Sequence, residues 1–154
     1  MVKALDGSSY KLVLVGAVSS NHQKYYNEIK KYIDKNENFY HFPYIQNEKL
    51  YQLYKMCRVS TLPSWLDTPG LVSLEAAAMG CNLAVSSRGS TGEYFGKDAF
   101  YCEPDDLKSI KNAIDLAYTN KDNKRLQEKV FQKYTWKEAA KATLKGYEMA
   151  MNRR

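Results

Sequence analysis

Short runs of apolar residues alternate along the chain with longer segments in which apolar side chains recur every three or four positions. The short runs are typical of buried strands, and the longer period is typical of amphipathic helices. Pro43 and Pro63 limit two of the runs, because proline cannot donate to a strand ladder. The pattern predicts strands over residues 11–18, 38–45, 59–64, 82–87 and 99–103, and helices over 21–36, 47–57, 68–79, 106–120, 121–134 and 135–154.

Strands that alternate with helices in this way favour an α/β fold. We expect a Rossmann-like, doubly wound parallel sheet with helices on both faces, formed as one domain by residues 1–154. Residues 88–98 are expected to be a loop. The first ten residues, "MVKALDGSSY", resemble the tail of a helix that belongs to a longer chain. Within 106–120 the spacing points Leu107, Ile110, Ile114 and either Leu116 or Ala117 inward.

Composition narrows the chemistry. An apolar fraction of 44% over 154 residues is enough for a core, and the net charge of +6 comes from basic clusters. Solvated helix faces explain that charge, and so does a surface for phosphorylated ligands or lipid head groups. No nucleic-acid signature accompanies it. Cys57, Cys81 and Cys102 have no CxxC spacing, so we expect free thiols in a reducing compartment and no metal site.

In open α/β sheets, ligands bind at the carboxyl ends of the strands. Three loops leave predicted strands at that edge, and they cover residues 16–23, 64–70 and 86–93. In the second loop Thr68 can cap the next helix, and Pro69 suits its first turn. The amides of Gly70, Leu71 and Val72 would then face an anion such as phosphate. An ordinary cap satisfied by water is the competing interpretation.

Glu75 lies in an apolar helix, where Leu71, Leu74 and Ala78 share its face at helical spacing. A carboxylate on such a face has to be paired or hydrogen-bonded, because burying it alone is costly. Hydroxyl groups of a sugar or ribose would satisfy it. An internal partner, either Arg88 or a backbone amide, is the alternative.

The segment "LPSWLDTPGLVSLEAAAMGCNLAVSSRGSTGE" resembles the signature of one protein family. The family is the GT-B retaining glycosyltransferases of group 1 (family 4), and the resemblance is to their C-terminal, nucleotide-sugar-binding domain. Its motifs are Pro-Ser, two acidic residues with seven between them, a Leu-Glu-Ala helix, and Ser-x-x-Gly. Pro63-Ser64, Asp67 with Glu75, Leu74-Glu75-Ala76, and Ser86 with Gly89 and Glu93 match them in turn. "YTWKEAAKATLKGYE" resembles the closing helix of the family.

The resemblance implies a site for a nucleotide-diphosphate sugar, with no cofactor. Glu75 would bind the ribose, and Asp67, the catalytic candidate, would lie beside the transferred sugar. The amides near Gly70 would hold the diphosphate, together with Leu71, Val72 and the expected cap, Thr68.

The implied site also includes residues at two strand ends, which would lie near the base of the nucleotide. Phe42 and Tyr44 would border the base at the end of their strand. The loop after Gly16 would line the same cleft.

The sequence departs from the family pattern in ways that matter. Asp67 replaces the usual Glu, Asn82 a proline, Ser90 a glycine and Pro43 another glycine. The opening strand of the family domain, its Arg- and Lys-bearing loop and the N-terminal acceptor domain have no counterpart. The chain is therefore expected to be half of a GT-B fold that lacks its first strand, with the missing N-terminal domain as its partner.

The implied activity is retaining transfer of a sugar in cell-surface polysaccharide or glycolipid synthesis. Such a protein would be cytoplasmic or peripheral to the inner face of the membrane, where lipid-linked acceptors lie. The isolated fragment is expected to be inactive. Two other functions remain open: a non-catalytic module that binds a nucleotide or a protein, and a GT-B epimerase. Hydrolysis by the two carboxylates is disfavoured, because a residue placed for ribose cannot serve the anomeric centre.

Overall fold

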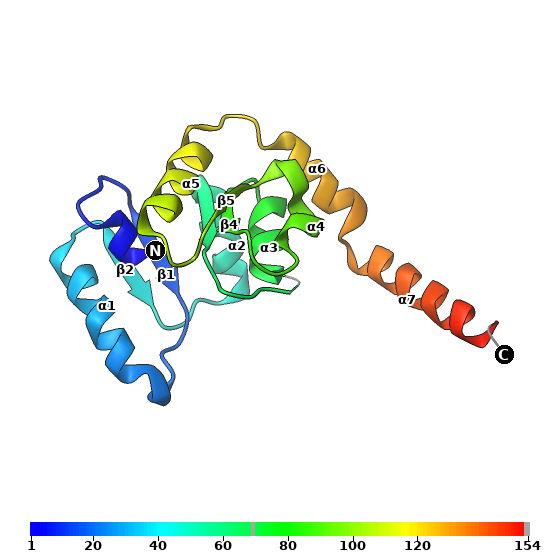
Figure 1. Cartoon of the computed structure of the whole chain (residues 1–154), viewed down its shortest axis with the longest axis horizontal. Coiled ribbons are helices and arrows are strands. Elements are labelled where there is room, and N and C mark those ends of the chain that lie inside the picture. The colour runs from blue at the N-terminus through cyan, green and yellow to red at the C-terminus, as the bar shows by residue number, and fades with distance from the viewer. Residues whose placement is uncertain (69, 153–154) are drawn as a thin grey trace.

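The computed structural model describes residues 1–68 and 70–152 (Figure 1). Pro69, Arg153 and Arg154 lie outside the described residues, so the interpretation of Pro69 as part of the first helical turn is not addressed. The strands are β1 (Leu12–Val15), β2 (Phe39–Phe42), β3 (Val59–Leu62), β4 (Asn82–Ser86) and β5 (Phe100–Cys102). The α-helices are α1 (Gln23–Lys35), α2 (Asn47–Met56), α3 (Leu71–Ala78), α4 (Thr91–Phe95), α5 (Leu107–Thr119), α6 (Lys124–Lys133) and α7 (Trp136–Met151), and the 3₁₀ helices are η1 (Val2–Leu5), η2 (Ser20–His22) and η3 (Gly96–Asp98).

All strand pairs are parallel, as predicted, and they are divided between two sheets. β1 pairs with β2 in one sheet, and the other has the order β3-β4-β5. Within the described residues no ladder joins β1 to β3. Each sheet therefore carries its own set of strand ends, a division that the sequence pattern did not predict.

Strand β4 is the centre of the larger sheet, and all five of its residues are buried. Ala84 belongs to one apolar cluster, with Cys102 and the α5 residues Ile110 and Ala113. Its neighbours Leu83 and Val85 belong to a second cluster, formed with α3, α4 and α6. Because successive side chains of a strand point to opposite faces, β4 is covered by helices on both sides. The predicted α/β class with helices on both faces is thereby confirmed.

The first apolar cluster joins the two sheets. It contains Leu12 of β1 and Phe39 of β2, and Ala84 of β4 lies in the same cluster. Helices η1 and α5 complete it, with Val2 and Leu5 buried from η1. The first residues thus form a short 3₁₀ helix that packs into the core.

Two predictions about local structure are wrong. Residues 88–98, expected as a loop, contain α4 and η3. The reason is packing: Phe95 is 1% exposed in the second cluster, and Thr91 Oγ1 donates to Ser86 O at 2.6 Å. In α5, Leu107 and Leu116 are about half exposed, and Ala117 is the inward residue beside Ile110 and Ile114.

Helix α7 extends away from the rest of the molecule and ends near the C-terminus (Figure 1). None of its residues is buried. Thr135 caps its first turn by accepting a hydrogen bond from the Glu138 amide at 3.3 Å. In the part of the chain that the structure describes, no helix is long and apolar enough to cross a membrane.

Asn82, which stands where the family has proline, is one of the few buried polar residues. Its Nδ2 donates to Ala117 O and Asn120 O, both at 2.9 Å, and Asn120 Nδ2 donates to Asn82 Oδ1 at 3.0 Å. The Asn82 amide donates to Arg58 O, so a proline here would lose that bond. Asn82 therefore fastens the end of α5 to the start of β4.

Replacing Asn82 by alanine should lower the free energy of unfolding by about 1–3 kcal/mol, because one buried and one partly buried carbonyl lose their donor. Urea denaturation followed by circular dichroism measures the change. Asn112→Ala is the control, since Asn112 is exposed on α5, the helix that Asn82 fastens to β4. Equal midpoints for the two variants would contradict the role given to Asn82.

Candidate functional site

A pocket of about 400 Å³ lies where β3 ends and α3 begins. It is formed by the second of the three loops picked out from the sequence. Asp67, Thr68, Gly70, Leu71 and Val72, all predicted site residues, line it. Its remaining lining residues are Leu62, Ser64 and Leu66.

Two polar atoms at this pocket lack a partner. Asp67 Oδ2 and Ser64 Oγ are buried, and neither has a hydrogen bond within the described residues. Thr61 Oγ1, in the same strand and loop segment, is in the same state. Buried polar atoms are nearly always paired in folded proteins, since an unpaired one costs about 1–3 kcal/mol. Asp67 Oδ2 and Ser64 Oγ therefore have unused hydrogen-bonding capacity beside the pocket.

The start of α3 differs from the prediction. Thr68 was expected to cap the helix, but the N-cap is Gly70, with φ at +61°, and no side chain caps it. That backbone conformation is open to glycine and costly for other residues. A Cβ at position 70 would also lie 3.2 Å from Asp67 Oδ2. Thr68 instead lies exposed at the rim of the pocket.

The first amides of α3 point out of its N-terminus and have no intrahelical partners. No backbone or side-chain acceptor within the described residues receives the amides of Leu71 or Val72. The side chains of these two residues are 53% and 46% exposed, so the expectation of an inward-facing Leu71 is wrong. Ser73, Leu74, Ala76 and Ala77 form the buried side of the helix. An anion at the pocket would meet unpaired amides and the positive end of the helix dipole.

Glu75 is half-buried, as its apolar surroundings require, and no hydrogen bond to its carboxylate is found among residues 1–68 and 70–152. It lies near Tyr54 of α2 and does not line the pocket beside Asp67. Burial and the nearby Glu75 charge raise the pKa of Tyr54 to about 12. The Tyr54 phenol therefore stays protonated.

The alternative in which Arg88 pairs with Glu75 is wrong. Arg88 Nη2 lies 3.0 Å from Glu103 Oε2, and Ser87 Oγ donates to Glu103 Oε1 at 2.6 Å. The Ser87 hydroxyl and Arg88 together hold the pKa of Glu103 below its ordinary value. Arg88 is thus already engaged, and its guanidinium also lies 5.8 Å from the centre of the Trp65 ring.

The second and third loops are fastened together. The Ser90 amide donates to Asp67 O at 3.3 Å, and Gly89 adopts φ of +74° beside the same residue. A Cβ at Gly89 would stand only 2.6 Å from Asp67 O, closer than real contacts allow. The Gly89 match in the sequence motif therefore has a structural reason: it lets the third loop hold the Asp67 backbone.

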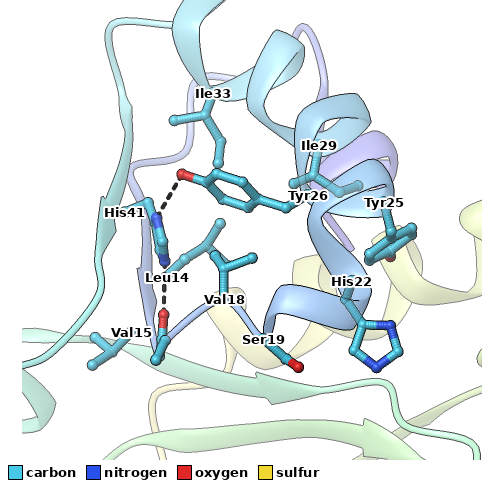
Figure 2. Close-up of a pocket in the computed structure, with 12 residues that line it drawn as sticks. Leu14, Val15, Val18, Ser19, His22, Tyr25, Tyr26, Ile29, Ile33 and His41 are labelled. Carbon is cyan, nitrogen blue, oxygen red and sulfur yellow. Dashed lines mark hydrogen bonds between the residues drawn. The ribbon is translucent and has the colours of Figure 1, made fainter.

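The first loop lies at a different pocket. Gly16 lines a pocket of about 530 Å³ between α1 and the β1-β2 sheet (Figure 2). This pocket and the Asp67 pocket share no lining residue. Phe42 and Tyr44, at the end of β2, are 44% and 77% exposed and line neither pocket. Tyr26 and His41, which sequence reasoning did not select, line the Gly16 pocket.

An open parallel α/β arrangement with a pocket at the carboxyl end of a strand is the form of a Rossmann-like fold. The family can be stated more narrowly. The model of the family "Glycosyl transferases group 1" matches residues 1–134, and the chain belongs to this family. An uncharacterised glycosyltransferase of Methanocaldococcus jannaschii is 27% identical over 158 residues, which cover 98% of this chain and 40% of that protein.

Solved structures show the same fold. Sucrose-phosphate synthase from Thermosynechococcus elongatus is 21% identical, with a TM-score of 0.83 over 99% of this chain and 42% of that one. A glycosyltransferase from Rickettsia africae is 17% identical, with a TM-score of 0.79 over 99% of this chain and 44% of that one. The C-terminal domain of a group 1 glycosyl transferase from Francisella tularensis is 17% identical, with a TM-score of 0.74 over 88% and 75%. The chain thus spans less than half the length of the curated relative and of the first two structures.

Gly89→Ala should lower the free energy of unfolding by roughly 1–3 kcal/mol, because the new Cβ meets the Asp67 carbonyl at a positive φ. Chemical denaturation measures the loss. Gly92→Ala, three residues on in α4, is the matched control, since its Cβ would meet nothing within 4 Å. That control should be neutral or more stable by about 0.5–1 kcal/mol. If both variants behave alike, the close approach at Gly89 is not the constraint described.

Proposed function

We propose that this chain is the donor-binding part of a retaining glycosyltransferase, and that it binds a nucleotide-diphosphate sugar in the Asp67 pocket. Membership of the group 1 family supports the reaction class. The observation that carries the assignment is the pair of buried, unpaired atoms, Asp67 Oδ2 and Ser64 Oγ, beside an uncapped helix N-terminus. Sugar hydroxyls would hydrogen-bond to these two oxygens, and a phosphate would accept hydrogen bonds from the helix amides.

In this proposal the diphosphate lies at the start of α3. The amides of Gly70, Leu71 and Val72 and the helix dipole would stabilise the negative charge that grows on the leaving group as the glycosidic bond breaks. Thr68, exposed at the rim, would add a hydroxyl. Exposed Leu71 and Val72 side chains leave the approach to these amides open, which a phosphate-sized group requires.

Asp67 would hold the transferred sugar. Its Oδ2 is buried and cannot be solvated by bulk water, so a hydroxyl donor there gains a charged hydrogen bond with little competition. Ser64 Oγ lines the same pocket and offers a second contact. Asp67 is one methylene shorter than the glutamate usual in the family, so we expect a donor sugar whose hydroxyl lies deeper in the pocket.

Glu75 would receive the ribose hydroxyls. It is half-buried, and its charge acts on the nearby Tyr54 phenol, which would donate to the ribose in this proposal. The base would then extend toward the end of β2, where Phe42 and Tyr44 are exposed, with Gly16 at the neighbouring strand end.

The acceptor would be bound by a further domain. Because the chain spans 40% of the curated relative and 42% of sucrose-phosphate synthase, an N-terminal acceptor domain of the same polypeptide fits the remaining length. A lipid-linked acceptor at the inner membrane surface, in polysaccharide or glycolipid synthesis, suits the net charge of +6, since anionic lipids attract basic surfaces.

Calorimetric titration of the 154-residue chain with UDP, GDP, ADP and their sugars tests the donor site. Binding of one of them in the micromolar to millimolar range is expected. No binding to any, together with an inactive longer protein, would favour the alternative of a non-catalytic module derived from this fold.

Glu75→Ala should weaken binding of the preferred nucleoside diphosphate by about 1–3 kcal/mol, the usual effect of losing a charged hydrogen bond. Calorimetry with the nucleotide, on protein whose circular dichroism is unchanged, measures the loss. Glu128→Ala is the control, because Glu128 is an exposed acid in α6, outside the three candidate loops. Unchanged affinity in Glu75→Ala would remove the ribose contact from the proposal.

Asp67→Ala should have two separable effects. Without ligand, the unfolding free energy should stay constant or rise by about 1 kcal/mol, because a buried unpaired oxygen is removed. Affinity for the nucleotide sugar should fall more than affinity for the bare nucleotide. Thermal denaturation and paired titrations measure these changes. Equal losses for the two ligands would show that Asp67 does not contact the sugar.

A further inference from the structure

Two hydrogen bonds connect α1, β2 and the end of β1 through one imidazole (Figure 2). Tyr26 Oη lies 2.9 Å from His41 Nδ1, and His41 Nε2 lies 2.8 Å from Gly16 O. The three residues come from different elements and converge at the wall of the same pocket. His41 is therefore the centre of a short chain that ends on the Gly16 backbone.

The direction of both bonds follows from the chemistry of the last partner. The Gly16 carbonyl oxygen can only accept, so His41 Nε2 carries the proton. In the neutral imidazole Nδ1 is then an acceptor, and Tyr26 donates to it. Both partners thereby favour the Nε2–H tautomer, and the two rings are tilted by 53° at a centroid distance of 5.2 Å.

Both backbone polar groups of Gly16, its amide and its carbonyl, are hydrogen-bonded. The Gly16 amide donates to Phe42 O at 3.0 Å, and its carbonyl is held by His41 from the same strand. Gly16 has φ of +151°, a conformation that glycine accepts readily. Around the turn, the pocket wall is mainly apolar, with Leu14, Val18 and Ile29. The pocket wall therefore has few other hydrogen-bond donors that could replace His41 at the Gly16 carbonyl.

We propose that His41, oriented by Tyr26, is a positioning residue that sets the Gly16 turn in the shape required by the bound donor nucleotide. The inference rests on the proposed function, in which the Gly16 turn borders the donor. His41 itself does not touch the nucleotide. It acts by holding the end of β1 against the end of β2, so that the two strand ends present one fixed surface.

Three variants test this role, with a matched control. His41→Phe keeps a ring and removes both bonds, His41→Gln can restore a donor to Gly16 O, and Tyr26→Phe removes only the orienting hydroxyl. Tyr25→Phe is the control, because Tyr25 is an exposed neighbour that lines the same pocket without a hydrogen bond among the described residues.

The first measurements use the ligand-free 154-residue chain. Long-range proton–nitrogen spectra of the imidazole should show the Nε2–H tautomer in the unmodified protein. In Tyr26→Phe they should show the same tautomer with a shifted Nδ1 signal, because the hydroxyl that donates to Nδ1 is lost. Hydrogen exchange of the Gly16 amide should be faster in His41→Phe and close to normal in His41→Gln and Tyr25→Phe. An Nδ1–H tautomer in the unmodified chain would overturn the assigned direction of the bonds.

The second measurement is affinity for the nucleoside diphosphate that the chain prefers among UDP, GDP and ADP. His41→Phe should weaken binding about tenfold, Tyr26→Phe by a smaller factor, and His41→Gln should recover most of the loss. Tyr25→Phe should bind normally. Faster Gly16 exchange without a loss of affinity in His41→Phe would mean that the pair only stabilises the fold, and the positioning role would be wrong.

Failure of the proposed function looks different. If the unmodified chain binds none of the three nucleotides, the donor site is wrong and the positioning role fails with it, even when the spectra show both hydrogen bonds intact. If the unmodified chain binds and every variant binds equally well, the donor site stands and the positioning role alone is overturned.

Discussion

The double burial of β4 is the constraint on which the rest of this structure depends. Its five residues have helices on both sides, and neighbouring side chains of the strand seed two separate apolar clusters. One cluster ties the small β1-β2 sheet to the large sheet through η1 and α5. The other fixes α3, α4 and α6. Because β3 and β5 pair with β4 in parallel, the loops that follow β3 and β4 come out on one edge, and there they meet at Asp67 and Gly89.

That arrangement explains why the Asp67 pocket combines a rigid backbone with unsatisfied side chains. The Asp67 carbonyl is held by the Ser90 amide and enclosed by Gly89, while its carboxylate oxygen Oδ2 has no hydrogen-bond partner among the described residues. A loop that only had to connect β3 to α3 would relax to solvate or pair that oxygen. In the proposed donor site such an arrangement would preorganise the acceptor, so that the cost of arranging polar groups falls on folding and not on binding.

The sequence predicted the elements well where burial alone determines them. Strand β4 and helix α5 were predicted from apolar runs and helical spacing. Prediction from the sequence failed where a tertiary contact determines the local structure. Thr68 is a good cap by type, yet Gly70 takes the N-cap position. Residues 91–95 look like loop, yet Phe95 packs into the second cluster and Thr91 bonds Ser86 O, so a helix forms.

The candidate site divides in the same way. Asp67, Gly70, Leu71 and Val72 are adjacent in sequence, so their convergence at one pocket could be predicted from a strand–loop–helix pattern. The pairing of Tyr26 with His41 could not, because the two residues lie fifteen positions apart on different elements and neither belongs to a motif. Both are ordinary residues in the sequence, and their importance appears only when the parallel pairing of β1 with β2 places His41 opposite Leu14, next to the turn it holds. The Gly16 turn is thus contacted by a residue that no motif contains, whereas the Asp67 loop is held at Gly89, which belongs to the motif.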